Sequence, residues 1–214
     1  MPAEKTERPT LWIVAGPNGS GKSTLYTTAN IEGFGRSIWI INPDLLAQQI
    51  SFVERRELSE ANLESVIRIE KWLWASIAAY KTVGVETVLS TAKYRPLVVD
   101  AKKKGFEIGL IFVILDDVEK NIERVRLRVE KGGHDVPEDR IRSRYKRSLR
   151  QLPWFLEHAD KALLYENSAE QPSLMASKER DAITIYPAAF EAIRRMIIRM
   201  PGHGLILGRK SPGR

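Results

Sequence analysis

The chain has 214 residues, no cysteine and a formal net charge of +7 at pH 7. Its length suffices for one domain with a sizeable core, and the lack of cysteine excludes disulfides and thiolate metal sites. The first ten residues, MPAEKTERPT, lack the apolar core of a signal peptide, and no apolar run approaches a membrane span in length. We therefore expect a cytoplasmic protein without membrane contact.

Short apolar runs alternate along the chain with segments of helical length. The runs predict strands over 11–15, 37–41, 85–91, 107–115 and 161–165. The spacing of apolar residues elsewhere predicts helices over 22–30, 44–55, 59–81, 95–104, 117–131, 137–151 and 187–199. Strands joined by helical crossovers indicate an α/β fold with a mainly parallel, five-stranded sheet covered on both faces.

The distribution of glycine and charge suggests how the chain is organised. We expect an N-terminal extension over residues 1–10, followed by a single domain over 11–200. Residues 201–214 are rich in glycine and basic side chains, which predicts a flexible tail. A second flexible segment is expected over 167–180.

Directly after the first predicted strand, the chain reads GPNGSGKST, which fits the phosphate-binding pattern G-x-x-x-x-G-K-[ST]. Glycines let such a loop curl so that its backbone N–H groups point at phosphate oxygens. Lys22 would bring a positive charge to the β- and γ-phosphates, and the Ser23 hydroxyl can ligate Mg²⁺. The residues expected to bind the nucleotide are Gly16, Pro17, Asn18, Gly19, Ser20, Gly21, Lys22, Ser23 and Thr24.

The second predicted strand leads into Ile41-Asn42-Pro43-Asp44. An Asn N-cap followed by Pro is an ordinary helix start, in which Asp44 would only favour the helix dipole. Alternatively, Asp44 lies at the carboxyl end of a parallel strand, where ligands bind in such sheets, and accepts the proton of an attacking hydroxyl. From the residues alone, both interpretations stay open.

The third predicted strand, VETVLST, contains a glutamate that a buried strand would not hold uncompensated. One interpretation is an edge strand with one solvent-facing side. The other is a polar substrate pocket lined by Glu86 and Thr87, or by Ser90 and Thr91 at the strand end. The fourth strand ends in Leu115-Asp116-Asp117, where an acid could hold Mg²⁺ through water, but a helix N-cap is the favoured role of Asp117.

A basic cluster follows, with ten Lys or Arg residues against four acids between Arg124 and Arg150. It can bind nucleic acid, a membrane surface or small polyphosphates, or form only the solvated faces of two helices. Tyr145 is its single aromatic residue, which argues against a stacking platform for single strands. Nucleic acid is therefore the less favoured partner.

Within this cluster, the spacing of arginines and glycines indicates a lid. Arg124 and Arg128 share a helix face at i, i+4 spacing, where they repel each other unless an anion lies between them. Gly132-Gly133 then provide a turn before the next helix. The pattern predicts an arginine-rich helical lid over about 124–150 that closes on a nucleotide.

Three blocks together resemble the zeta-toxin family of P-loop kinases, especially its chromosomal members. The blocks are GPNGSGKST, INPD, and the basic stretch around Gly132-Gly133-His134-Asp135-Val136-Pro137. The resemblance covers roughly residues 11–168 and implies a three-layer α/β/α kinase-like sandwich. The best-known members use ATP to phosphorylate UDP-N-acetylglucosamine at the sugar 3′-hydroxyl.

The resemblance also implies roles for individual residues. Asp44 matches the catalytic base, Glu86 and Thr87 fall in the substrate-contacting strand, and Arg128 and Arg144 are the arginines expected near the substrate and the γ-phosphate. The implied function is an ATP- and Mg²⁺-dependent kinase acting on a hydroxyl of a small molecule, and an antitoxin protein is a candidate partner. The alternatives are a polynucleotide 5′-hydroxyl kinase and a nucleotide-gated module that binds RNA or a protein.

Overall fold

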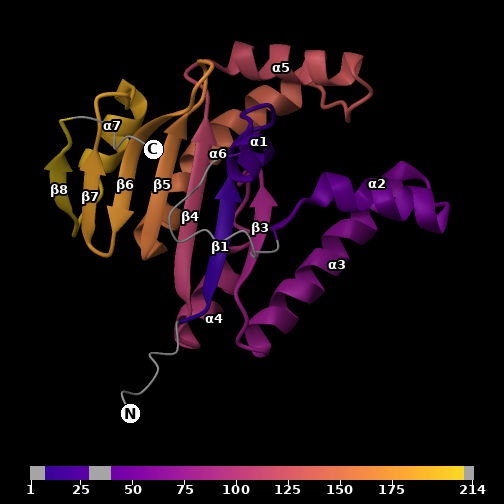
Figure 1. The fold of residues 1–214 in the computed structure, drawn as a ribbon, viewed down its shortest axis with the longest axis horizontal. Coiled ribbons are helices and arrows are strands. Elements are labelled where there is room, and N and C mark those ends of the chain that lie inside the picture. The colour runs from indigo at the N-terminus through magenta and orange to yellow at the C-terminus, as the bar shows by residue number, and fades with distance from the viewer. Residues whose placement is uncertain (1–7, 29–39, 210–214) are drawn as a thin grey trace.

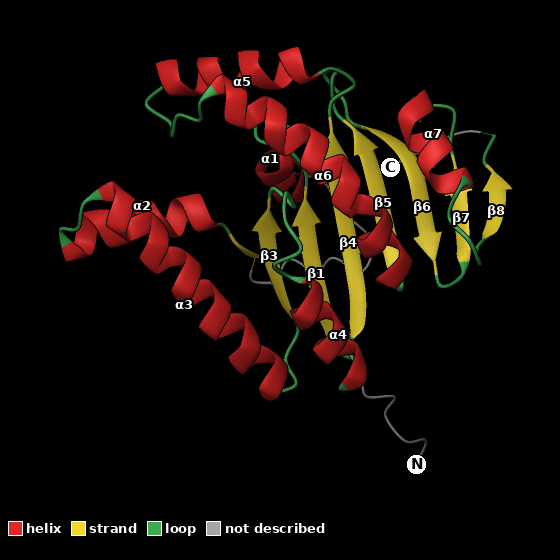
Figure 2. Ribbon diagram, turned by 180° about the vertical axis from the view of Figure 1, so that it is seen from behind, coloured by secondary structure: helices red, strands yellow, loops and turns green. Residues whose placement is uncertain are grey.

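A computed structural model describes residues 8–28 and 40–209, which form one eight-stranded sheet with helices on both faces (Figures 1 and 2). The strands are β1 (Thr10–Ala15), β2 (Ile40–Ile41), β3 (Val83–Thr87), β4 (Glu107–Ile114), β5 (Lys161–Glu166), β6 (Ser173–Glu179), β7 (Ala182–Ile185) and β8 (Gly204–Leu207). The helices are α1 (Lys22–Thr28), α2 (Pro43–Glu54), α3 (Leu58–Ala78), α4 (Arg95–Lys103), α5 (Val118–Glu130), α6 (Glu138–His158) and α7 (Glu191–Ile198).

The strand order is β2-β3-β1-β4-β5-β6-β7-β8. The first five strands in this order are parallel, β6 runs antiparallel to both of its neighbours, and β8 is parallel to β7. Ala15 at the end of β1 lies opposite Thr87 of β3 and Phe112 of β4. The carboxyl ends of these strands therefore meet at one edge of the sheet, where ligands bind in open α/β folds.

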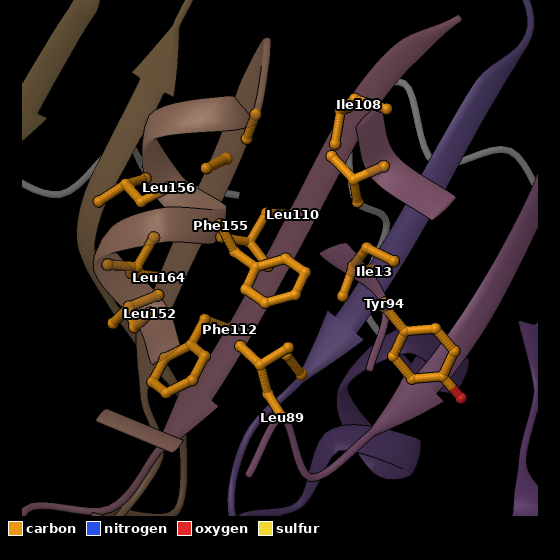
Figure 3. Packing of buried hydrophobic residues seen from close by; sticks show 14 of the residues in the cluster. Ile13, Leu89, Tyr94, Ile108, Leu110, Phe112, Leu152, Phe155, Leu156 and Leu164 are labelled. Carbon is orange, nitrogen blue, oxygen red and sulfur yellow. The ribbon is translucent and has the colours of Figure 1, made fainter. Parts of the chain in front are cut away.

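The alternating side chains of the central strands form a core on each face of the sheet. Towards α4 and α6, Ile13 and Phe112 pack with Phe155, as Figure 3 shows. On the opposite face, Trp12 packs with Leu25 of α1. Trp12 fits there because the residue opposite it on β4 is Gly109, at which a Cβ atom would lie 2.4 Å from the indole ring.

The expected α/β/α kinase-like fold is confirmed, but the sheet has three more strands than the five expected. Of the predicted strand 37–41, only 40 and 41 fall within the described residues. The final predicted lid helix, 137–151, continues as α6 to His158 despite Pro153 in its interior.

Two segments expected to be flexible are strands instead. Ser173–Glu179, within the segment 167–180, forms β6, and Gly204–Leu207, within the expected tail, forms β8. The sequence of β6 does not show the usual alternation of polar and apolar residues, because it contains serines and a lysine. The Lys178 side chain is nevertheless buried, and it donates hydrogen bonds to carbonyl oxygens at the end of α6. In β8 only three residues lie between Gly204 and Gly208, and their pairing with β7 is not visible in the local sequence.

None of the helices in the described part of the chain is long and apolar enough to cross a membrane.

Candidate active site

The glycine-rich loop joins β1 to α1 at the carboxyl edge of the sheet. Gly16, Gly19 and Gly21 all have positive φ, at 143°, 75° and 85°. A Cβ atom on Gly16 would lie 2.0 Å from the Val113 carbonyl oxygen, and one on Gly19 would lie 2.6 Å from that of Asn121. These positions require glycine both for the backbone conformation and for the close approach of neighbouring chain segments.

Lys22, the first residue of α1, is buried with 6% of its surface exposed. Its Nζ donates hydrogen bonds to the carbonyl oxygens of Gly16 (2.8 Å) and Pro17 (3.0 Å), which leaves a third N–H donor for a ligand. Burial lowers the pKa of Lys22, while the negative charges of Glu86 and Asp44 act in the opposite direction. The lysine is thus held as part of the loop, and two carboxylates lie close enough to influence its pKa.

Glu86, near the end of β3, accepts three hydrogen bonds on its Oε2 atom. The donors are Ser23 Oγ (2.9 Å), Tyr26 Oη (3.0 Å) and Asn42 Nδ2 (3.0 Å). Burial and the negative charge of Glu86 raise the pKa of Tyr26 to about 12, so its phenol remains a donor at neutral pH. The edge-strand interpretation of Glu86 is wrong, because β3 lies between β2 and β1 and the carboxylate faces the cleft.

Asp44 lies in the first turn of α2. The side chain of Asn42 caps this helix by accepting hydrogen bonds from the backbone N–H groups of Asp44 (2.9 Å) and Leu45 (3.3 Å), and Pro43 is the first helical residue. The expected helix start is therefore confirmed. The exposed Asp44 also lines the same cleft as the loop and acts electrostatically on Lys22 and Arg144. Capping of α2 by Asn42 thus leaves the carboxylate of Asp44 available to a ligand.

Three arginines line the other side of the cleft, namely Arg124 and Arg128 on α5 and Arg144 on α6. Their guanidinium groups bond neutral oxygens: Arg124 the Ser168 carbonyl (3.5 Å), Arg128 the His134 carbonyl (2.5 Å) and Arg144 the Asn18 side chain (3.3 Å). Within residues 8–28 and 40–209, none of the three forms an ion pair with a carboxylate. Uncompensated positive charge on this side of the cleft favours an anionic ligand.

The two helices that carry these arginines pack against each other. Val125 of α5 forms a small buried cluster with Val136 and Ile141, and an ion pair joins Glu119 of α5 to Arg142 of α6. The expected N-cap at Asp117 is confirmed, since its side chain accepts a hydrogen bond from the backbone of Glu119. The arginines therefore project from a common helical support.

The cleft has a volume of about 870 Å³, enough for a nucleotide together with a small second substrate. It brings together almost all of the side chains predicted from the sequence. Of these, the lining includes Asn18, Gly19, Gly21, Lys22, Ser23, Thr24, Asp44, Glu86, Thr87, Arg128 and Arg144. Gly16, Pro17 and Ser20 lie in the loop but not in the lining.

Three polar residues whose hydrogen bonds hold the site together were not predicted from the sequence. They are Tyr26, which bonds Glu86, and two asparagines that brace the loop. Asn121 of α5 is fully buried and donates to the Asn18 carbonyl (2.6 Å), and Asn167 after β5 donates to the Ser20 carbonyl (2.8 Å). The sequence did indicate that Asn121 is buried, because it lies four residues before Val125 and therefore on the same, apolar face of α5.

A parallel sheet and a glycine-rich loop that closes on a buried lysine define this chain as a P-loop protein of the kinase-like class. The profile of the zeta toxin family matches residues 2–171, and the chain belongs to this family.

One relative and two solved structures show what else this chain is similar to. An uncharacterized protein of Haemophilus influenzae is 29% identical over 147 residues, which is 64% of this chain and 99% of that protein. The AvrRxo1-ORF1:-ORF2 complex with ATP is similar with a TM-score of 0.64 at 18% identity; the match covers 80% of this chain but only 59% of that chain.

The PezAT toxin–antitoxin structure from Streptococcus pneumoniae has a TM-score of 0.54 at 15% identity, covering 78% of this chain and 72% of that chain. At such identities these structures show a shared fold. Family membership and fold together make the chain a nucleotide-dependent, kinase-type protein.

Proposed function

We propose that this protein is an ATP- and Mg²⁺-dependent phosphotransferase that moves the γ-phosphate of ATP to a hydroxyl of a small molecule. One observation carries the proposal: a single cleft contains the loop lysine Lys22, the carboxylate of Asp44, and three arginines that form no ion pair with a carboxylate in the described part of the chain. Such a set combines phosphate binding, charge stabilisation and a proton acceptor, which are the contributions that a protein makes to phosphoryl transfer.

The proposed roles follow from where each charge lies. Lys22 neutralises the β- and γ-phosphates, and Arg128 and Arg144 stabilise the charge on the phosphoryl group during transfer. Asp44 accepts the proton of the attacking hydroxyl. Arg124, 3.9 Å from where a Cβ of Gly21 would lie, contributes to nucleotide binding next to the loop. We further propose that the arginine-rich segment 124–150 acts as a lid, which excludes water when the nucleotide is bound.

The residues around Ser23 fit a magnesium ion. Within the described residues there is no cluster of three or more His, Cys, Asp or Glu side chains that could hold a metal by itself. Mg²⁺ is commonly bound by one or two protein oxygens together with substrate phosphates and water, for which Ser23 and Glu86 suffice. When bound, the ion would neutralise charge on the β- and γ-phosphates.

The hydrogen bonds of Glu86 also refine its proposed role. Ser23 donates its hydroxyl proton to Glu86 Oε2, and Ser23 Oγ accepts a long hydrogen bond from Asn42 Nδ2 (3.4 Å), which leaves one lone pair of the hydroxyl oxygen for a metal. We therefore favour Glu86 as the group that orients Ser23, held in place by Tyr26 and Asn42, over a direct contact with the acceptor. Thr87, whose hydroxyl accepts a hydrogen bond from the Leu89 backbone, lies next to it and keeps its proposed place in the acceptor site.

The remaining lining of the cleft indicates what kind of acceptor fits. It includes the hydroxyl-bearing Ser90, Thr91 and Tyr94 and, besides Arg144, the cation of Lys93, which pairs with Glu70 at 3.6 Å. Hydroxyl groups suit a sugar, and the cations suit an anionic group on the same molecule. A UDP-N-acetyl amino sugar combines both features and is the first acceptor to test.

A polynucleotide 5′-hydroxyl kinase is the second candidate function. The basic stretch between Arg124 and Arg150 favours it, and the fold is shared with the Pnkp1/Rnl/Hen1 RNA repair complex at a TM-score of 0.52 and 20% identity, over 70% of this chain and 47% of that chain. A small acceptor is favoured instead, because the basic stretch has a single aromatic residue on which a base could stack and because arginines line one side of the cleft.

The two candidates differ in which acceptor stimulates ATP consumption. We would measure ADP release and acceptor phosphorylation with UDP-N-acetylglucosamine, with a 5′-hydroxyl oligonucleotide, and with neither. Stimulation by the sugar nucleotide supports the first candidate, and stimulation by the oligonucleotide supports the second. If neither stimulates turnover while RNA binds in a salt-sensitive manner, a nucleotide-gated binding protein replaces both.

A protein partner is a further proposal. The PezAT structure comes from a toxin–antitoxin system, and the AvrRxo1 structure is a complex of two gene products. We propose that an antitoxin-type protein regulates this chain as well. Co-purification with the product of a neighbouring gene, together with loss of ATP turnover on binding, is the test.

A further inference from the structure

The C-terminal part of the chain adds structure that the proposed reaction does not use. The family match ends at residue 171, and β6, β7, α7 and β8 all follow it. They extend the sheet to the end opposite α2 and α3, so that β8 is the outermost strand (Figure 1). None of the residues that line the nucleotide cleft comes from these four elements.

The outermost strand is an unprotected edge. Within residues 8–28 and 40–209, β8 pairs with β7 and with no other strand. Its three apolar side chains are exposed, Leu205 to 44%, Ile206 to 51% and Leu207 to 75%. Edge strands are usually shielded by charges, prolines or bulges, and Gly204–Leu207 contains none of these.

The hydrogen-bond register shows which backbone groups face outward. The N–H groups of Gly204 and Gly208 donate to the Asp181 and Ile185 carbonyl oxygens of the β7 side, both at 2.9 Å. Because successive residues of a strand alternate in direction, the N–H and C=O groups of Leu205 and Leu207 point away from β7. They form a preformed template for one more strand.

The strand is also fixed in position. Besides the hydrogen bonds at both of its ends, Gly208 lies against the ring of Tyr186, where a Cβ atom would come within 2.5 Å. A strand held in this way pays little conformational entropy when another strand pairs with it.

The charge of the residues that flank the strand in the chain indicates what can pair with it. Within the described residues 199–209 there are two cations, Arg199 and Arg209, and no Asp or Glu. Pairing of β8 with a second copy of itself would bring two such basic segments together, which like-charge repulsion opposes. A segment with apolar and acidic residues would instead match both the exposed leucines and the charge.

We propose that β8 binds an extended, acidic and apolar segment of another protein by β-strand addition. The main-chain groups of Leu205 and Leu207 provide the hydrogen bonds, the three exposed side chains provide apolar contact, and the basic residues that flank the strand in the chain, Arg199 and Arg209, select acidic partners. This binding site is separate from the nucleotide cleft and does not depend on the proposed phosphotransfer.

The test measures binding of a fluorescein-labelled peptide of about eight residues that alternates Ile and Glu, with a peptide that alternates Ile and Lys as the control. The full chain is used at low and at high salt. We expect the acidic peptide alone to bind, more weakly at high salt. Leu205→Pro and Leu207→Pro remove outward donors without touching the bonds to β7, and each should weaken binding about tenfold or more.

Two controls distinguish loss of the β8 binding site from unfolding of the protein and from nonspecific binding of the peptide. Ile198→Thr removes an exposed apolar residue of α7 and should leave peptide binding unchanged. Both proline variants should keep the melting temperature and the ATP turnover of the wild type. The proposal is overturned if the acidic peptide does not bind or if the proline variants bind it equally well. It is also overturned if sedimentation shows a dimer that the proline variants disrupt, since β8 would then pair with a second copy.

Discussion

Replacing Tyr26 with Phe removes one of the three hydrogen bonds that fix Glu86 beside Ser23. A hydrogen bond to a charged group contributes about 1.5–3 kcal/mol. We expect about 1–1.5 kcal/mol for the bond from Tyr26, because Tyr26 is partly exposed and two other donors still bond Glu86 after the substitution. If Glu86 orients Ser23 for Mg²⁺, that loss raises the Mg²⁺ concentration for half-maximal activity about five- to tenfold. The melting temperature should fall by about 2–5 °C.

The assay is ATP turnover as a function of Mg²⁺ concentration, with the KM for ATP measured at saturating Mg²⁺. We expect the KM to stay near the wild-type value, because Lys22, Asn121 and Asn167 still bond the carbonyl oxygens of the phosphate loop. Tyr80→Phe is the matched control, since Tyr80 lies after α3 and outside the cleft and should change neither quantity. A Tyr26→Phe variant with a lowered melting temperature but an unchanged Mg²⁺ requirement would refute the metal-orienting role and leave Tyr26 a structural residue.

Four other substitutions test the rest of the cleft. Lys22→Ala should abolish ATP turnover and leave the fold intact. The control Lys103→Ala, on the exposed side of α4, should change neither. ATP binding of both variants is measured by calorimetry, and their folding by circular dichroism. Arg128→Ala and Arg144→Ala should each lower kcat more than they raise the KM for ATP, and wild-type rates in both would place the catalytic charge elsewhere. Asn121→Leu should cost about 1–3 kcal/mol in urea unfolding and weaken ATP binding, because it frees the Asn18 turn; unchanged affinity would contradict the bracing role.

The sequence predicted the part of the fold in which local pattern and burial agree. The runs at β1 and β4 are continuously apolar because both faces of these strands are covered, and their turns and helices follow at regular spacing. In β6 and β8 the pattern failed for two different reasons. The buried Lys178 finds carbonyl partners on α6, and the apolar residues of β8 are exposed, so neither strand follows the usual relation between polarity and burial.

The residues of the candidate site also divide into those that the local sequence predicts and those that it does not. The loop was predictable because its chemistry lies in consecutive residues, and the arginines because they are clustered. Tyr26, Asn121 and Asn167 were missed because each is a single polar residue whose partner lies 60, 103 and 147 positions away in the chain. A periodic pattern reports which side of an element is buried but not which distant group that side meets.

The central claim is that Asp44 accepts the proton of a hydroxyl that attacks ATP in this cleft, and the direct test is acceptor phosphorylation by Asp44→Asn. The substitution keeps the size of the side chain and leaves the Asn42 cap of α2 in place. We would follow transfer of labelled γ-phosphate to UDP-N-acetylglucosamine, or to whichever acceptor stimulates the wild type, beside ATP affinity and melting temperature. The account predicts wild-type ATP affinity, a melting temperature within a few degrees of the wild type, and transfer slowed about 10²–10⁴-fold. Transfer at the wild-type rate would show that Asp44 only begins a helix, and the proposed mechanism would be wrong.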